Sequence, residues 1–290
     1  MLELAMALQH LPFLATREQL LLQEIYSGIE DLRKVSARDL LQAVGRPYRG
    51  QSFQADELIE QVRRELAWMP TAGISPVHLW STRYPALLRE ISDPPVVLYI
   101  RGDLCEKPCV SVVGTRRPTT EGRQAAYSVG QKLVRLGYAV VSGLALGIDA
   151  AAHAGALQGG GTTIAVLGSG VDRIYPRSNS RLASRMMVQG GSLISEFPPG
   201  TMPRKHHFPQ RNRIIAGLSA LTIVVEAPRG SGALITADYA IGRREVMVHK
   251  AGYESVLGDG CRELVLDGAG VLADADELAP AFLQGIPDEY

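Results

Sequence analysis

Cysteine is scarce in this sequence. Its 290 residues include three cysteines, an odd number, and no two of them form a C-x-x-C pair. This pattern argues against a disulfide framework and against a structural zinc site. We expect Cys105, Cys109 and Cys261 to be small buried hydrophobic side chains.

Long apolar runs are also missing. No run approaches the roughly 20 consecutive apolar residues that span a bilayer. The first residues include Glu3 and His10, whereas a signal peptide has a basic segment followed by an apolar core. The sequence therefore predicts a cytoplasmic protein without a membrane partner. Its length and its 46% hydrophobic content suffice for an α/β core and a smaller domain.

The chain carries no net charge, because 30 basic side chains balance 30 acidic ones. Overall charge thus gives no reason to expect binding to nucleic acid. The distribution is uneven, however: from residue 173 to 225 there are eight bases and one acid, Glu196, so 8 − 1 gives a local charge of +7. A polyanion would bind such a patch. The bases are Arg173, Arg177, Arg181, Arg185, Arg204, Lys205, Arg211 and Arg213.

Two nucleotide-binding motifs are absent from the first strand, turn and helix. Neither a G-x-G-x-x-G nor a G-x-x-x-x-G-K-[ST] pattern occurs there, so neither a common dinucleotide site nor a Walker site is supported. No Cys or carboxylate cluster accompanies the adjacent His206 and His207, which argues against a metal site. We therefore expect no cofactor and no metal.

What is present is an alternation of strand-like and helix-like segments. A β-branched run from residue 109 stops at Gly114, a helical segment covers about residues 120–136, and a strand at 138–141 runs into Ser142 and Gly143. Another helix begins near Asp149 and carries His153. This order predicts a parallel doubly wound sheet. Its ligand site should lie where the carboxyl ends of the strands meet the helix starts.

The first turn has residues suited to phosphate. Gly114 lets the backbone approach a ligand closely, Thr115 offers a hydroxyl, and Arg116 presents a planar fork, with Arg117 beside it. A phosphate-bearing ligand is one interpretation. The alternative is a glycine that ends a strand beside two solvated arginines.

The alternation continues to the end of the chain. Further strands are expected at 162–167, 192–195, 221–225 and 245–249, and the pieces 264–266 and 271–272 should complete the sheet. Gly168 closes one strand, and Ser231 and Gly232 precede a helix at about 233–243, so both turns should face the same crevice as Gly114. The acidic tail from Asp274 leaves no room for another domain.

Two helical segments carry the basic patch. Arg177, Arg181 and Arg185 recur every four residues on one face of a helix at about 178–189, and solvated surface is the ordinary interpretation of such a stripe. In residues 204–217 the aromatic Phe208 lies among the four cations Arg204, Lys205, Arg211 and Arg213, with Asn212 between the last two. Cations that follow phosphates and an aromatic ring that stacks on a base bind single-stranded nucleic acid. Alternatively, Phe208 is a hydrophobic plug and Arg213 a helix surface residue.

The first 70 residues have a different character. Leucines in helical alternation, broken by glycines, predict four or five short helices. Prolines then hold residues 69–102 extended. We expect a small helical domain at 1–75, either an interaction module or a packing appendage, and an α/β domain at 76–290.

Six blocks of this sequence, taken in order, resemble the DNA-processing protein A family, also called DprA or Smf. They are residues 112–118, 141–153, 175–176, 195–200, 208–217, and 225–227 with 231–237. The likeness covers about residues 80–245.

This resemblance implies an extended Rossmann-like fold, with a SAM-like or helix-hairpin-helix-like helical domain before it. It also implies a homodimer that binds single-stranded DNA, protects incoming DNA and helps to load the RecA recombinase in natural transformation, without being an enzyme. Gly114, Thr115 and Arg116 match the family's phosphate-binding turn. Lys205, Phe208, Arg211 and Arg213 fall in its DNA-contacting segment.

The sequence departs from the family at two places. Residues 248–265 replace the family's asparagine-bearing segment, and the winged-helix-like domain of many members has no counterpart. A competing hypothesis is a Rossmann-like nucleotide-binding enzyme or sensor, similar to phosphoribohydrolases. Glu226 and Asp149 would be its candidate catalytic acids, although hydrogen bonds to loop N–H groups explain both equally well.

Overall fold

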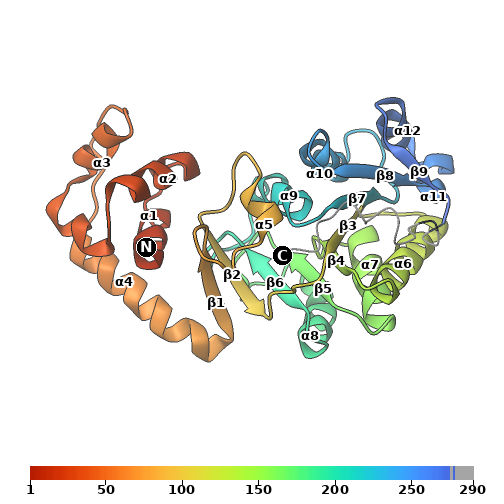
Figure 1. The fold of residues 1–290 in the computed structure, drawn as a ribbon, viewed down its shortest axis with the longest axis horizontal. Coiled ribbons are helices and arrows are strands. Elements are labelled where there is room, and N and C mark those ends of the chain that lie inside the picture. The colour runs from red at the N-terminus through yellow and green to blue at the C-terminus, as the bar shows by residue number, and fades with distance from the viewer. Residues whose placement is uncertain (275–276, 278–290) are drawn as a thin grey trace. The chain divides into compact units, whose positions relative to one another are not determined.

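The computed structural model describes residues 1–274 and residue 277. The chain forms two compact units (Figure 1). The first comprises Met1–Tyr84 and Ser92–Tyr99, and the second comprises Pro85–Ile91 and the chain from Ile100 onward. The boundary expected near residue 75 falls inside strand β1 (Ile74–His78), within the first unit. No helix in the described part of the chain is long and apolar enough to cross a membrane.

The first unit is mainly helical. Its core forms around α1, where Leu4, Met6 and Leu8 are completely buried, and Ile59 and Val62 of α4 are buried with them. The helical elements are α1 (Leu2–Gln9), α2 (Thr16–Ile25), η1 (Ile29–Lys34), α3 (Ala37–Ala43), α4 (Ala55–Trp68) and η2 (Met69–Ala72). The unit also contains β1 and the first half of β2 (Val97–Gly102).

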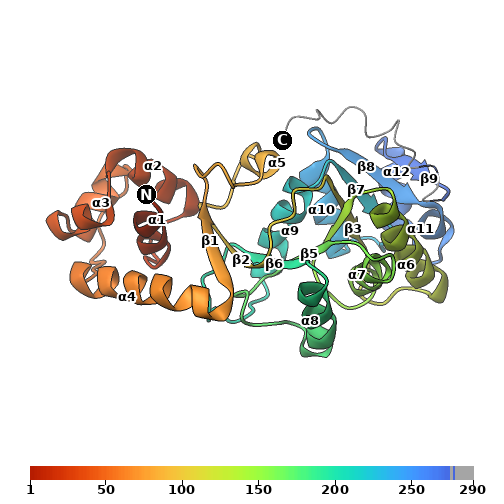
Figure 2. The ribbon, with the colours of Figure 1, turned by 60° about the horizontal axis from the view of Figure 1, so that its bottom comes forward.

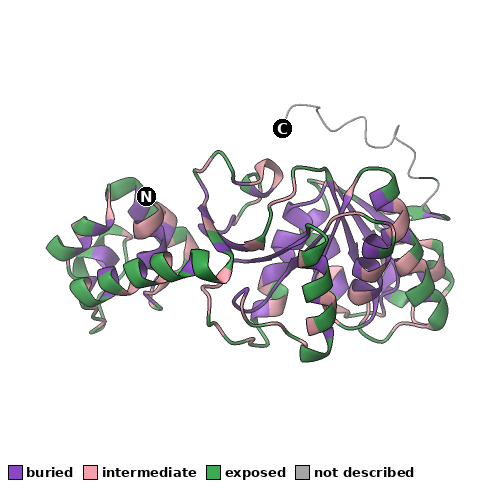
Figure 3. Ribbon diagram, turned by 90° about the horizontal axis from the view of Figure 1, so that it is seen from below, coloured by how far each residue is buried: buried purple, intermediate pink, exposed green. Residues whose placement is uncertain are grey.

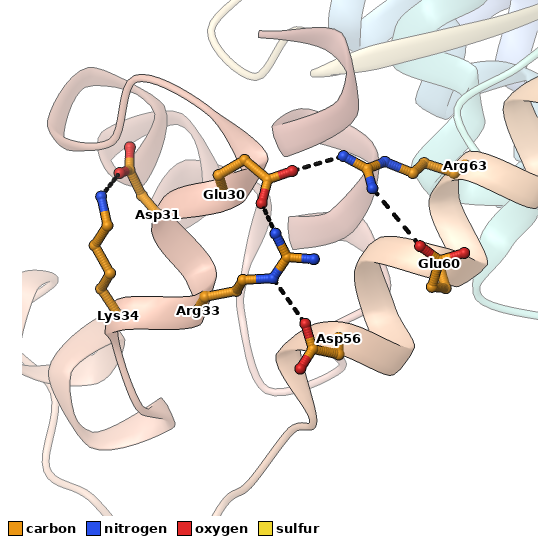
Figure 4. Close-up of polar contacts among 7 residues, drawn as sticks. All are labelled: Glu30, Asp31, Arg33, Lys34, Asp56, Glu60 and Arg63. Carbon is orange, nitrogen blue, oxygen red and sulfur yellow. Dashed lines mark hydrogen bonds and ion pairs between the residues drawn. The ribbon is translucent and has the colours of Figure 1, made fainter.

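An ion-pair network joins η1 to α4 on the surface of this unit (Figure 4). The Nε of Arg33 lies 2.7 Å from Oδ1 of Asp56, and Arg63 Nη2 lies 2.6 Å from Oε1 of Glu30. Glu30 also contacts Arg33, and Glu60 lies 3.6 Å from Arg63. Ion pairs this exposed to water contribute little to stability, so the network reinforces a packing that the apolar core determines.

The second unit is built on parallel strands, as the alternating pattern predicts. Its described residues place seven strands in the order β6-β5-β4-β3-β7-β8-β9, and every neighbouring pair is parallel. They are β3 (Cys109–Val113), β4 (Ala139–Ser142), β5 (Thr163–Val166), β6 (Ser192–Ser195), β7 (Leu221–Val224), β8 (Glu245–His249) and β9 (Gly270–Leu272).

Helices cover both faces of this sheet (Figures 1 and 2). Helices α6 (Thr120–Arg135), α7 (Ile148–Gln158) and α8 (Ser180–Val188) lie on one face, and α9 (His207–Gly217) and α10 (Gly232–Ala240) on the other. The strands and the inward sides of these helices are buried (Figure 3). The order of strands reverses between β3 and β7, and the carboxyl ends beside that reversal are where doubly wound folds bind ligands. The expected fold class, an α/β Rossmann-like unit beside a small helical one, is confirmed.

Besides the short 3-10 helix η3 (Arg177–Asn179), three shorter α-helices complete the described elements. They are α5 (Ala86–Arg89), α11 (Lys250–Glu254) and α12 (Asp259–Leu266). The prediction that residues 264–266 form a strand was wrong, because they are the last turn of α12. A three-residue apolar run fits a buried strand and one side of an amphipathic helix equally well. Most of the tail expected to be acidic, 275–276 and 278–290, lies outside the described residues.

Glycines let α6 and α7 pack closely. A Cβ at Gly130 would lie 2.2 Å from the carbonyl oxygen of Ala152, and a Cβ at Gly155 would lie 2.0 Å from that of Tyr127. Both obstacles are backbone atoms, which move only if a helix moves. The separation of α6 from α7 therefore depends on these two residues.

We expect Gly130→Ala to lower the melting temperature, because the backbone clash outweighs the roughly 1 kcal/mol by which alanine favours a helix interior. The matched control is Gly232→Ala in α10, where an added Cβ meets nothing within 4 Å. Thermal denaturation followed by circular dichroism should show a lower midpoint for the first variant and an unchanged or higher one for the second. Equal midpoints would contradict the close packing.

Candidate nucleic-acid interface

The turn after β3 is tied to the turn after β7. The amide of Thr115 donates to the carbonyl oxygen of Glu226 at 2.7 Å, and the amide of Ile148 donates to that of Thr115 at 3.2 Å. A Cβ at Gly114 would lie 2.5 Å from Cγ1 of Ile148 and 2.8 Å from the Glu226 carbonyl oxygen. Only glycine fits there, so the predicted phosphate turn has a rigid base at the carboxyl edge of the sheet.

An exposed group of one cation and two aromatic rings lies at this edge. The guanidinium carbon of Arg116 is 5.5 Å from the centre of the Phe208 ring. The ring of Tyr175 packs on the ring of Phe208, with 5.5 Å between the ring centres and 42° between the ring planes. Arg116 is exposed, Tyr175 is 46% exposed and Phe208 is half-buried. We call Arg116, Tyr175 and Phe208 the aromatic-cation cluster.

Tyr175 was not among the site residues predicted from the sequence. The residue lies in the loop after β5, far in sequence from both of its neighbours in the cluster. Its one signal was the Tyr175-Pro176 pair, which belongs to the blocks that carry the family resemblance.

Other predicted contacts lie near the cluster in sequence and are accessible. Arg117 and Lys205 are exposed, as are Arg204 and His206. Thr115 is half-buried, and its Oγ1 accepts a hydrogen bond from the amide of Arg117 at 3.2 Å, which holds the turn after Gly114. The predicted residues Arg116, Arg117, Lys205 and Phe208 are thus available to a ligand.

Gly168, at the end of β5, faces Phe208. A Cβ at this position would lie 3.0 Å from Cδ1 of the Phe208 ring, so a larger side chain would push the ring. The hydrophobic-plug alternative for Phe208 is therefore partly realised, because one side of the ring packs on protein while the residue keeps some exposure.

Arg211 lies in the interior, although it was predicted from the sequence to contact DNA. It is 3% exposed, and its Nη1 donates to the carbonyl oxygen of Val166 at the end of β5. Burial lowers the pKa of Arg211 to about 10, while the negative charge of Asp149 acts in the opposite direction. A Cβ at Gly143 would lie 2.0 Å from Arg211 Nη1, so this predicted site glycine makes room for the buried guanidinium.

Arg213, two residues further along α9, is also interior. Its Nη1 and Nη2 donate to Oε1 and Oε2 of Glu196 at 2.7 Å each, and the two side chains are 4% and 8% exposed. The alternative that Arg213 is a helix surface residue was wrong. Two of the eight bases of the +7 patch, Arg211 and Arg213, therefore face inward, and Glu196 pairs with one of them. The other six are exposed.

Three further predicted residues make hydrogen bonds within the protein. The side-chain Nδ2 of Asn212 donates to the carbonyl oxygen of Gly232 at 3.0 Å, and the hydroxyl of Ser142 donates to that of Val112 at 2.6 Å. Ser231 caps α10, because its Oγ accepts from the amide of Ala233 at 3.3 Å. These contacts position the edge of the sheet, while Gly232 itself is exposed.

The two candidate catalytic acids are engaged with loop groups, as their alternative interpretation held. Glu226 is fully buried and accepts from the amide and, at 2.7 Å, from the hydroxyl of Thr119. Asp149 accepts from the amides of Gly143 and Ala145 at 3.1 and 3.3 Å. Burial raises the pKa of Asp149, and the nearby Arg211 opposes that shift.

The turn between β4 and α7 is held from a second direction. The side-chain Nδ2 of Asn179 donates to the carbonyl oxygens of Leu144 and Ala145 at 2.9 and 3.2 Å. Leu144 has a φ of 55°, the one positive value outside glycine in the described residues, and its side chain is completely buried. The turn beside Gly143 is therefore fixed by Asp149 on one side and Asn179 on the other.

The histidines near the site are packing groups. The ring of His207 stacks on Phe197 at 4.0 Å, and its Nδ1 lies 3.1 Å from the carbonyl oxygen of Gly168. His153 is completely buried, and burial lowers its pKa to about 3, with the charge of Arg211 acting in the same direction. No group of three or more potential metal ligands occurs in the part of the chain that the structure describes.

Sequence comparison places this chain beside DNA-processing proteins. Residues 76–282 match the model of the DNA recombination-mediator protein A family. The chain is 38% identical to the DNA processing protein DprA of Bacillus subtilis over 229 residues, which cover 78% of this chain and 77% of that protein. It is 45% identical to Protein Smf of Synechocystis over 211 residues, 70% of this chain, and this match spans 52% of the Synechocystis protein.

Solved structures agree with this placement. The X-ray structure of DNA processing protein A from Streptococcus pneumoniae is similar with a TM-score of 0.74 and 34% identity, over 95% of this chain and 94% of that one. A structure of DNA processing protein A from Helicobacter pylori, which concerns its single-stranded DNA binding mode, is similar with a TM-score of 0.65 and 29% identity. That match covers 73% of this chain and 96% of the Helicobacter chain.

We expect Arg213→Ala to lower the free energy of unfolding by about 3–5 kcal/mol, because it leaves the carboxylate of Glu196 buried without its cation. The double variant Glu196→Gln/Arg213→Met, which removes both charges, should recover part of that loss. Urea denaturation measures both. The exposed Lys205→Ala is the matched control and should stay within about 0.5 kcal/mol of the wild type. A stable Arg213→Ala protein that fails to bind DNA would make Arg213 a contact residue instead.

Proposed function

Because this chain belongs to the DNA recombination-mediator protein A family, we propose that it binds single-stranded DNA at the aromatic-cation cluster of Arg116, Tyr175 and Phe208. The observation that carries the proposal is the meeting of Arg116 and two accessible rings at the carboxyl edge of the sheet. Rings of this kind stack on unpaired bases, and arginines beside them contact the phosphates. The Helicobacter structure, which concerns single-stranded DNA binding, supports the same ligand.

Phosphate contacts would come from exposed cations around the cluster. Arg116 and Arg117 follow β3, and Lys205 precedes Phe208 by three residues, so all three lie on segments that reach the same edge. The rigid base of the β3 turn supports this role, since a turn whose backbone is already fixed loses no further backbone freedom on binding. The buried residues Arg211, Asn212 and Arg213 would hold α9 in place and thereby fix the position of Phe208 in its first turn.

The proposal extends to a role in the cell. The protein would protect incoming single-stranded DNA, act as a homodimer and help to load the RecA recombinase during natural transformation. A family described as a recombination mediator supports this role. It would be a binding protein and not an enzyme, an assignment supported by the loop hydrogen bonds that engage Asp149 and Glu226.

We expect the protein to bind single-stranded DNA more tightly than duplex DNA of the same sequence, because a stacking site needs unpaired bases. Fluorescence anisotropy with matched oligonucleotides tests this preference, and a panel of free nucleotides tests the competing enzyme or sensor hypothesis. Equal or tighter binding of the duplex would refute the proposal. Tight binding of a mononucleotide with none of the oligonucleotide would favour the competing hypothesis.

Two variants separate stacking from charge within the cluster. Phe208→Ala should weaken single-strand binding by roughly 1–3 kcal/mol without changing its salt dependence, because no charge is lost. Arg116→Ala should weaken binding and also lower the slope of log K against log salt by about 0.7, the value for one phosphate contact to a single strand. Anisotropy titrations at several salt concentrations measure both quantities. A sharp fall in melting temperature with normal binding by the folded Phe208→Ala protein would identify the ring as core.

A further inference from the structure

We propose that the arginine stripe of η3 (Arg177–Asn179) and α8, made of Arg177, Arg181 and Arg185, continues the path of single-stranded DNA beyond the aromatic-cation cluster. The stripe would bind phosphates and read no base. This inference rests on the proposed function, because it extends the same ligand along a second surface.

The three arginines are exposed and carry uncompensated charge. Each is exposed, and none has an ion pair or a side-chain hydrogen bond among the described residues. On α8 the buried side chains are Ala183 and Met186, so Arg181 and Arg185 occupy the opposite, outward face. Some other exposed arginines do form ion pairs, as Arg33 does with Asp56 and Arg46 with Glu18. The stripe is therefore an unpaired cationic surface.

The position of Arg181 is unfavourable for the helix itself. Arg181 is the second residue of α8, where the positive end of the helix dipole repels a cation, and no acid occupies the first turn. Arginines four residues apart also repel one another. Asn179, at the N-cap position, makes no capping bond to α8, because its side chain donates to the turn after β4 instead. An anion at this end of α8 would relieve all three effects.

The same contacts join the stripe to the aromatic-cation cluster. Tyr175, whose ring packs on Phe208, precedes Arg177 by two residues. Asn179, between Arg177 and Arg181, is fixed by its two hydrogen bonds to the turn beside Gly143. The stripe thus begins at the carboxyl edge of the sheet. It follows α8 toward the opposite edge, since the helix leads to the start of β6.

Spacing and chemistry fit the backbone of a single strand. Residues four apart on a helix are separated by about 6 Å along its axis, so the stripe offers successive cations in one line. A cationic surface that follows a strand without stacking groups gives affinity independent of sequence. A strand leaving the cluster would therefore gain phosphate contacts there once it is long enough to reach α8.

The test compares oligo(dT) of 6 and 20 nucleotides on the full chain. For Arg181→Ala/Arg185→Ala we expect tenfold or greater loss of affinity for the 20-mer at low salt. The slope of log K against log salt should fall by about 1.4, twice the value for one phosphate. Affinity for the 6-mer should change less than twofold. The melting temperature should stay the same or rise, because repulsion has been removed.

The control is Lys107→Ala/Arg135→Ala. Both side chains are exposed and lie before β3 and β4, outside η3 and α8, so the control removes the same charge and leaves the stripe intact. Three outcomes would overturn the proposal that the DNA path continues along the stripe. They are an equal loss of 20-mer affinity in the control variant, no loss in the stripe variant, and an equal loss for both oligonucleotides in the stripe variant. Wild-type protein that binds neither oligonucleotide would refute the proposed function itself.

Discussion

The buried guanidinium of Arg211 is the interaction on which the candidate site depends. It reaches from α9 to the end of β5 through the carbonyl oxygen of Val166, and it lies against the turn of Gly143 near Asp149. Because a charge in the interior needs partners with fixed geometry, the ends of β4 and β5 and the start of α9 are held in one arrangement. Phe208 lies one turn before Arg211 on α9, so this arrangement also sets where the ring meets Arg116.

Helix α9 therefore has two functions along one short sequence. Its first turn carries the half-buried Phe208. In its middle, the side chains of Arg211 and Arg213 point into the protein, and Arg213 forms an ion pair with Glu196. Such ion pairs contribute little net stability when their desolvation is counted, but breaking one is costly. The positive charge that a strand of DNA would meet thus comes from the six exposed bases of the segment and not from the two buried ones.

Much of this architecture could be predicted from the sequence. Buried parallel strands are β-branched runs that stop at glycine or serine, so β3, β4 and β5 were found within about one residue of their ends. The direction of an arginine side chain could not be predicted in this way. Arg211 points inward to the carbonyl oxygen of Val166 and Arg213 to Glu196, and these partners come from distant segments that meet only in the folded chain. The same holds for Tyr175, which the loop after β5 brings to Phe208.

Leu144 shows how a strained backbone can be kept by the side chain that it carries. An ordinary residue in the left-handed region loses about 1–2 kcal/mol relative to its preferred conformation, and glycine would remove that strain. A completely buried leucine, however, leaves a cavity that costs about 2–5 kcal/mol when it is truncated. The second effect is larger, so leucine is the more stable choice at a position whose backbone alone favours glycine. The turn beside the site is consequently less tolerant of substitution than its loop location implies.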